Sequence, residues 1–217
     1  MTLHMQRELD KLTKMILSLS AVVEESVQQA VDSLERLDID LAEKVIGSDD
    51  SIDQMEVDLE EECLKILALY QPVAADLRFI VSVLKINNDL ERIADLAVNV
   101  AERTVGVSGE GRIPPPFDLP EMGGKVRAML GKSLDALVNR EPQAALEACR
   151  LDDEVDAIHK ENYRLVKDQI RKHPERLDSL IQYISVSRHL ERIADLATNI
   201  AEDVLYMIEG EIVRHTF

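Results

Sequence analysis

The sequence predicts an all-α protein built as two similar three-helix bundles, which arise from an internal repeat of about 100 residues. Hydrophobic residues make up 46% of the 217 residues, so the chain can bury a core. Aromatic residues make up only 3%, and helix-interrupting residues are few, with 8 Gly and 7 Pro. A motif that begins at residue 90 returns 100 positions later. Long helices in two equivalent units account for these observations.

The first predicted helix runs from near the N-terminus to about residue 38. Its apolar residues recur in steps of three and four, which is the spacing of an amphipathic helix. A second helix is predicted from about Leu41 to Ala68 and a third from about Ala74 to Thr104, because Pro72 interrupts the helical pattern between them. The apolar residues of the first helix are Leu12, Met15, Ile16, Leu19, Val22, Val23, Val27, Ala30 and Leu34.

A segment rich in glycine and proline then separates the two repeats. It reads VGVSGEGRIPPPFDLPEMGG and holds five of the eight glycines and four of the seven prolines. We therefore predict a first repeat over 1–105, a linker over 106–122 and a second repeat over 123–217. The predicted helices of the second repeat run from about Lys125 to Asn139, from Pro142 to before Pro174, and onward to about Glu209. Six main helices are expected in all.

The repeat preserves polar residues as well as apolar ones. Residues 90–102 read LERIADLAVNVAE and residues 190–202 read LERIADLATNIAE, which are identical at 11 of 13 positions. The preceding stretches, 77–89 and 177–189, share one identical residue and otherwise keep only the apolar pattern. A recent duplication would have preserved these stretches too, so the polar residues of the motif are constrained by something other than packing. Those residues are Glu91, Asp95, Asn99, Glu102, Glu191, Asp195, Asn199 and Glu202.

Hairpin geometry brings further carboxylates to the motif of the first repeat. At about 100° per residue, the polar side chains of the motif share one helix face, opposite the apolar one. Asp53 and Glu91 are equally far along the chain from Pro72, one before it and one after it, and the same is true of Asp49 and Asp95. Equal distances from the turn of an antiparallel hairpin mean equal heights. Two carboxylate pairs should therefore meet at one level.

The second repeat predicts the same arrangement about Pro174. Asp156 precedes this proline and Glu191 follows it. Their distances from the proline, counted in residues along the chain, differ by only one residue. Asp152 and Asp195 flank the proline with the same near-equality, further out on the two helices. Four carboxylates at close range favour either protonation or a bound cation.

Oxygen ligands of this kind suit hard or borderline cations, and we expect iron, manganese, magnesium, zinc or calcium. The alternative is a solvated acidic face that is neutralised by Arg92, Arg192 and lysines. Residues with weaker support as ligands are Asp50, Asp153, Asn99, Glu102, Asn199 and Glu202.

Charge and composition limit the function classes. The chain has 42 acidic and 25 basic residues and a net charge of −17, which opposes binding to nucleic acid and to anionic membranes. Cys63 and Cys149 form no metal-binding spacing and are expected in the core. With no apolar run near the roughly 20 residues of a membrane span, and no signal-peptide pattern, we expect a cytoplasmic protein.

The doubled motif resembles the PhoU family. ERIAD-x-x-x-N-x-x-E occurs once in each repeat, with Ala94 and Ala194 where the family usually has glycine. The segment LYQPVAADLR around Pro72 is also similar to the family's first hairpin. The resemblance extends over essentially the whole chain.

This resemblance implies two adjacent three-helix bundles and negative regulation of phosphate uptake and of the phosphate-starvation (Pho) response. The implied partners are the ATPase of the phosphate ABC transporter and a sensor histidine kinase, with membrane association only peripheral and through these partners. A homodimer is also expected, and no nucleic acid. Some family members carry metal clusters on paired E/DxxxD motifs. These motifs correspond to Asp49, Asp53, Glu91 and Asp95, and to Asp152, Asp156, Glu191 and Asp195.

Two alternatives to a non-enzymatic adaptor follow from the same residues. A carboxylate-bridged di-metal enzyme normally has two ExxH motifs, but this chain offers only Asp156-x-x-His159, with Asp53-x-x-Glu56 as its counterpart. The other alternative is a purely structural helical scaffold without metal. We find no nucleophile triad and no phosphate-binding loop, and we expect Ser187 to be an ordinary helix-surface residue.

Overall fold

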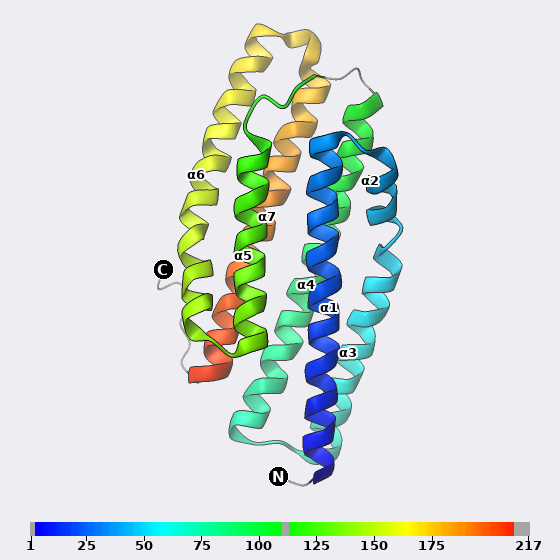
Figure 1. Ribbon diagram of the computed structural model, residues 1–217, viewed down its shortest axis with the longest axis vertical. Helices are drawn as coiled ribbons and strands as arrows, with labels where there is room; N and C mark the ends of the chain where they lie inside the picture. The colour runs from blue at the N-terminus through cyan, green and yellow to red at the C-terminus, as the bar shows by residue number, and fades with distance from the viewer. Residues whose placement is uncertain (1–2, 110–112, 211–217) are drawn as a thin grey trace.

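A computed structural model describes residues 3–109 and 113–210, and all regular structure within these ranges is helical (Figure 1). The all-α prediction is therefore confirmed. In chain order, the helices are α1 (Leu3–Arg36), α2 (Ile39–Ile46), α3 (Asp49–Tyr70), α4 (Ala74–Gly109), α5 (Leu119–Asn139), α6 (Pro142–Lys172), the 3-10 turn η1 (Pro174–Arg176) and α7 (Leu177–Glu209).

The helices form two units that lie side by side with their long axes aligned (Figure 1). The first unit contains α1 to α4, and the second contains α5 to α7. Helices α4 and α7, which carry the two copies of the repeated motif, make the most extensive contact between any two helices. A second contact between the units joins α1 to α5. The predicted pair of three-helix bundles is thus present, and it forms one body with a shared interface.

Helix α1 forms because its apolar residues fall on one face, which then packs into the core. Leu12, Ile16, Leu19 and Val23 on this face are each at most 1% exposed. The spacing that predicted an amphipathic helix is therefore confirmed. Both cysteines are also buried and unpaired, as predicted.

The prediction of a single helix from Leu41 to Ala68 is wrong, because the chain breaks at Gly47 and Ser48. Gly47 ends α2, and α3 begins one residue after Ser48, whose hydroxyl donates to the Val45 carbonyl at 2.7 Å. Glycine is a poor helix former, and a serine side chain competes for backbone hydrogen bonds. Over the described residues there are accordingly seven α-helices and a 3-10 turn instead of six helices.

The connection between the units is shorter than the predicted linker over 106–122. Helix α4 continues to Gly109, and α5 begins at Leu119. The Asp118 side chain accepts a hydrogen bond from the Glu121 backbone N–H at 3.0 Å, and Pro120 is in the first turn, where proline is tolerated. The prolines and glycines thus mark a helix start as well as a loop. Within the described ranges, no helix is both long enough and apolar enough to cross a bilayer.

Candidate metal centres

The two hairpins, α3–α4 and α6–α7, each direct an acidic face away from the core. On α4, Ile93, Ala97 and Val100 are 0–1% exposed because they pack inward. Glu91 and Asp95 lie on the opposite face and remain accessible. Residues four apart on a helix are neighbours, so each E-x-x-x-D motif presents two carboxylates at successive turns.

In the second unit, the carboxylates come close enough to share one cation. Asp156 on α6 and Glu191 and Asp195 on α7 each offer an oxygen, and these oxygens lie within 4.8 Å of one another. No other group of three acidic, histidine or cysteine side chains in the described ranges meets this condition. Asp152 lies beside this group, and its Oδ1 accepts a hydrogen bond from Thr198 Oγ1 at 3.3 Å.

Electrostatic effects show that these groups act on one another. Burial raises the pKa of Asp152, and the charge of Asp195 raises it further. Burial, then Glu191 and Asp156, raises the pKa of Asp195. The pKa of Glu191 is also raised, by burial and then by Asp156, although Arg188 opposes this shift. A cation would remove the repulsion that protonation otherwise relieves.

In the first unit the predicted carboxylates also act on one another electrostatically, although no three of them in the described ranges offer oxygens within 4.8 Å of one another. Burial raises the pKa of Asp49, and Asp53 and Asp95 raise it further. The pKa of Glu91 is raised by burial, then by Asp95 and Asp53, while burial and then Asp53 raise the pKa of Asp95. The charge of Asp53 on α3 therefore acts on both Glu91 and Asp95 of α4, while the close approach of these side chains across the hairpin stays a prediction.

The break between α2 and α3 distinguishes the first cluster from the second. It places Asp49 in the first turn of α3, whereas its counterpart Asp152 lies within the uninterrupted α6. Asp49 Oδ1 is buried and has no hydrogen-bond partner in the described part of the chain. Buried oxygens without a partner are costly, and a bound cation would supply one. The donor set of carboxylates and the unpartnered Asp49 oxygen both fit an oxygen-ligated metal.

Three residues with weaker support lie beside the second cluster. The charge of Asp153 contributes to the raised pKa of Asp152. Asn199 and Glu202 line a groove of about 560 Å³ together with Asp152 and Asp195. They are positioned as neighbours of the cluster, outside its closest group.

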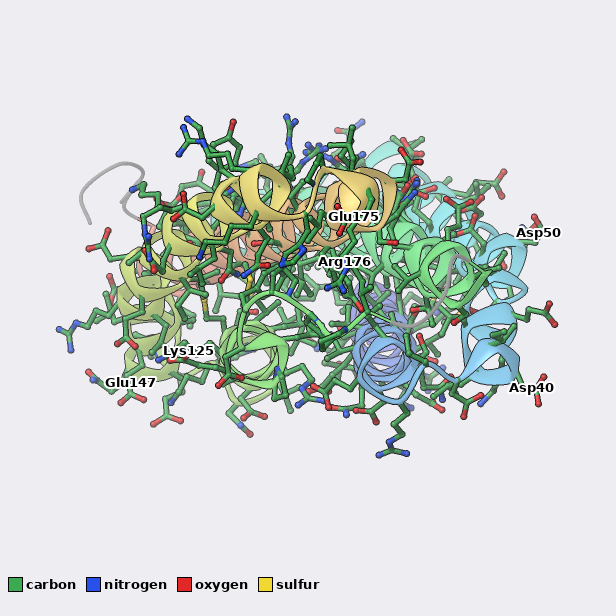
Figure 2. The ribbon with its side chains drawn as sticks, turned by 90° about the horizontal axis from the view of Figure 1, so that it is seen from above. Asp40, Asp50, Lys125, Glu147, Glu175 and Arg176 are labelled. Atoms are coloured by element: carbon green, nitrogen blue, oxygen red, sulfur yellow. The ribbon has the colours of Figure 1, made fainter. Side chains whose placement is uncertain are left out.

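The corresponding residues of the first unit are more dispersed. The Asn99 side chain donates to the Asp95 backbone carbonyl at 2.7 Å, so its amide is engaged with its own helix. Glu102 Oε2 lies 3.6 Å from Arg103 Nη2. Asp50 is at the outer edge of the molecule when viewed from above (Figure 2), although its charge contributes to the raised pKa of Asp49.

Two further side chains near the clusters belong to the incomplete ExxH motifs of the sequence. Glu56, one turn after Asp53 on α3, contributes to the raised pKa of Glu91, and its Oε1 accepts from Asn87 Nδ2 at 3.2 Å. Its counterpart is His159, one turn after Asp156. Their position one turn from a predicted ligand on the same helix was the available signal for both.

His159 is held by a polar network that Ser187 organises. Ser187 is buried, so its predicted surface position is wrong. Its hydroxyl donates to Met122 Sδ at 3.4 Å and accepts from Asn162 Nδ2 at 3.1 Å. His159 Nδ1 lies 2.9 Å from the same hydroxyl, and which of the two atoms donates depends on the tautomer of the ring. The tautomer with the proton on Nδ1 has a free lone pair on Nε2, which is the form that binds metals.

The two centres therefore differ in the donors that surround them. The first is surrounded by carboxylates alone, which suits magnesium, calcium or manganese. The second has the imidazole of His159 beside it, whose pKa is lowered chiefly by burial, although Asp156 and Asp195 oppose this shift. Imidazole suits zinc and iron better than it suits magnesium or calcium.

Comparison with known proteins assigns the chain to a family. The model of the PhoU domain matches twice, over residues 16–104 and 119–204, once in each helical unit. The chain belongs to the PhoU domain family. The resemblance seen in the doubled motif is thereby confirmed.

Named PhoU relatives align over nearly the whole chain. A protein of Clostridium acetobutylicum named phosphate-specific transport system accessory protein PhoU homolog is 34% identical, with 96% of this chain and 95% of that protein covered. A protein with the same name from Pseudomonas aeruginosa is 38% identical, covering 96% of this chain and 86% of the relative.

Solved PhoU structures share the fold. The crystal structure of PhoU from Pseudomonas aeruginosa superposes with a TM-score of 0.93 at 37% identity, covering 95% of this chain and 99% of that one. The PhoU regulatory protein from Streptococcus pneumoniae gives a TM-score of 0.85 at 29% identity, covering 96% and 99% of the two chains. The two-bundle architecture is therefore that of the family.

Proposed function

We propose that this PhoU-family protein is a metal-binding negative regulator of phosphate uptake and of the phosphate-starvation response. It acts in the cytoplasm, without catalysing a reaction, as an adaptor between the ATPase of the phosphate ABC transporter and its sensor histidine kinase. Family membership supports a role in phosphate transport, since the relatives are named as accessory proteins of that system.

The observation that carries the metal-binding part is the carboxylate cluster on each hairpin. Asp156, Glu191 and Asp195 offer three oxygens within 4.8 Å, and Asp49 presents a buried oxygen without a partner. Bound cations would neutralise both clusters and hold the two helices of each hairpin together. Metal occupancy would thereby set the charge and rigidity of two outward faces that a partner could contact.

Elemental analysis of protein purified without chelators or metal-binding tags tests this directly. We expect metal to co-purify, and we expect about half to be lost when the second cluster is neutralised. The matched control variant carries substitutions in the first cluster alone. A variant that combines both sets of substitutions should contain no bound metal. An unchanged metal content in the combined variant would disprove the sites. The substitutions are Asp152→Asn, Asp156→Asn, Glu191→Gln and Asp195→Asn in one variant, and Asp49→Asn, Asp53→Asn, Glu91→Gln and Asp95→Asn in the other.

The adaptor role predicts binding to proteins and not to DNA. With a net charge of −17, acidic residues would steer association with basic patches on the ATPase and the kinase cytoplasmic domain. Binding should weaken as salt rises over roughly 0.05–0.5 M, because exposed charges are screened. Titration against each isolated partner measures this. Tight, salt-resistant binding to promoter DNA with no binding to either protein would contradict the adaptor role.

The regulatory role predicts that deletion of the gene derepresses phosphate-starvation genes in phosphate-rich medium. A promoter reporter measures the effect, and the wild-type chain should restore repression. The combined metal-site variant should restore it less well at equal protein level. A deletion strain with unchanged reporter output, and with no other PhoU-family gene, would reject this role.

A further inference from the structure

A cavity of about 370 Å³ lies at one end of the molecule. It is formed by the start of α1, the start of α4, the turn between α5 and α6, and the end of α7, which gather at the lower end of Figure 1. Both helical units therefore contribute to its wall. None of the clustered carboxylates lines it.

Two arginines line this cavity without an acidic partner. Arg78, from α4, has a buried Nε with no hydrogen-bond partner in the described part of the chain. Arg140, from the turn between α5 and α6, places its guanidinium 5.7 Å from the centre of the Phe79 ring. Neither arginine forms an ion pair within 4.0 Å with any described residue, although the chain carries a large excess of acids.

The backbone around the cavity also favours a negatively charged ligand. Ala75 and Asp76 line it from the first turn of α4, where the backbone N–H groups lack intrahelical partners and favour a negative charge. Gly210 lies against Arg78 with a φ of +78°, and a Cβ there would be 3.3 Å from Arg78 Cζ. The end of α7 thus packs against this guanidinium. That contact explains where Arg78 lies but gives its buried Nε no partner.

We infer that this cavity binds a small phosphate-bearing anion. Guanidinium groups present paired donors that match phosphate oxygens, and helix N-termini bind phosphate for the reason given above. Ligand cavities span about 300–1,000 Å³, so this one has room for inorganic phosphate with water, or for a small phosphate ester. Asp10 and Asp76 also line the wall, and their charges oppose the anion and limit its affinity.

Calorimetric titration of the metal-free full chain tests this site, since chelation prevents phosphate from binding to metals in the carboxylate clusters. Inorganic phosphate and glycerol phosphate are titrated separately at constant ionic strength, and sodium chloride is the blank. Saturable binding of either anion is expected. The anion that binds more tightly shows whether the cavity prefers free phosphate or a phosphate ester. Absence of saturable binding by both overturns the site.

Variants with opposite expected effects make the test specific. Arg140→Gln, at an exposed position, should weaken binding by about tenfold or more, and Arg78→Gln should weaken it at least as much. Asp76→Asn should strengthen binding several-fold, because it removes a repelling charge. The control is Arg36→Gln, whose side chain is 69% exposed at the opposite end of α1. Binding that Arg140→Gln leaves unchanged, with helicity intact, would overturn the site.

Discussion

Carboxylates that share one helix face repel one another unless something compensates their charge, and the two clusters are surrounded by different side chains. The two copies of the motif differ at only two positions, and one of these has Val98 in the first copy and Thr198 in the second. The Thr198 hydroxyl donates a hydrogen bond to Asp152. Glu56 and His159 occupy equivalent places beside the two clusters. Single substitutions have therefore made two equivalent sites chemically distinct.

The raised pKa values predict that the metal-free protein is destabilised by its own clusters. A carboxyl group whose folded pKa is raised stabilises the fold below its unfolded pKa, near 3.8 for aspartate, and loses this contribution as the pH rises through the folded value. Substituting Asp152→Asn with Asp195→Asn should therefore stabilise metal-free protein at pH 7 by about 0.5–1 kcal/mol, a modest figure because these groups are partly solvated. Thermal unfolding with a chelator measures this.

The stabilisation should disappear near pH 4, where the wild-type carboxyl groups take up protons. Asp135→Asn, at an exposed position on α5, is the matched control and should change stability by less than about 0.5 kcal/mol. A variant that is less stable than the wild type at pH 7 without metal would show that the clusters are not repulsive.

At the scale of helices, glycine positions decide how elements begin, end and approach one another. Gly47 helps to end α2, and this break moves Asp49 to a helix N-terminus. Gly123 and Gly124 are adjacent in α5, but their surroundings differ. A Cβ on Gly123 would lie 2.6 Å from Val31 Cγ1, whereas a Cβ on Gly124 would meet nothing within 4 Å.

These two glycines predict opposite effects of the same substitution. Gly123→Ala should destabilise the protein by about 1–3 kcal/mol, because the buried Val31 side chain must move for α1 and α5 to stay in contact. Gly124→Ala should stabilise it by about 0.5–1 kcal/mol through helix propensity alone. Chemical denaturation of both variants measures the difference, and equal effects would contradict this packing of α1 on α5.

At the scale of the whole molecule, α4 and α7 join the two repeats. Lys85 Nζ lies 2.9 Å from Asp203 Oδ1 across this interface, and the Asp203 side chain is only 6% exposed. Lys85 also lies over the Tyr206 ring, 5.4 Å from its centre. Elsewhere in the interface, Arg103 Nη1 donates to Gln182 Oε1 at 3.1 Å.

Because Asp203 is buried, removal of its lysine partner should be costly. Lys85→Met should destabilise the protein by about 1–3 kcal/mol, and combination with Asp203→Asn should recover part of that loss. A double-mutant cycle from denaturation curves measures the coupling energy. The exposed pair Lys44 and Glu25, 4.0 Å apart, should give a coupling near zero. Equal couplings for the two pairs would contradict a structural role for Lys85.

The sequence by itself determined the helical class, the two units and the three carboxylates that converge on the second hairpin. These features follow from the spacing of apolar residues along a helix and from the number of residues between a side chain and the turn. Both are local or nearly local properties of the sequence. It also predicted the burial of Cys63 and Cys149 correctly. It did not predict the break at Gly47, because one glycine within a helical pattern is often tolerated.

Tertiary structure alone decided which residues from the two units meet. The contact of Lys85 with Asp203 and the cavity with Arg78 and Arg140 join residues far apart in the chain. No periodic pattern links such residues, because their proximity depends on how one helix pair docks on another. Docking is set by the shapes of complete packed faces, and those shapes exist only once the helices have assembled.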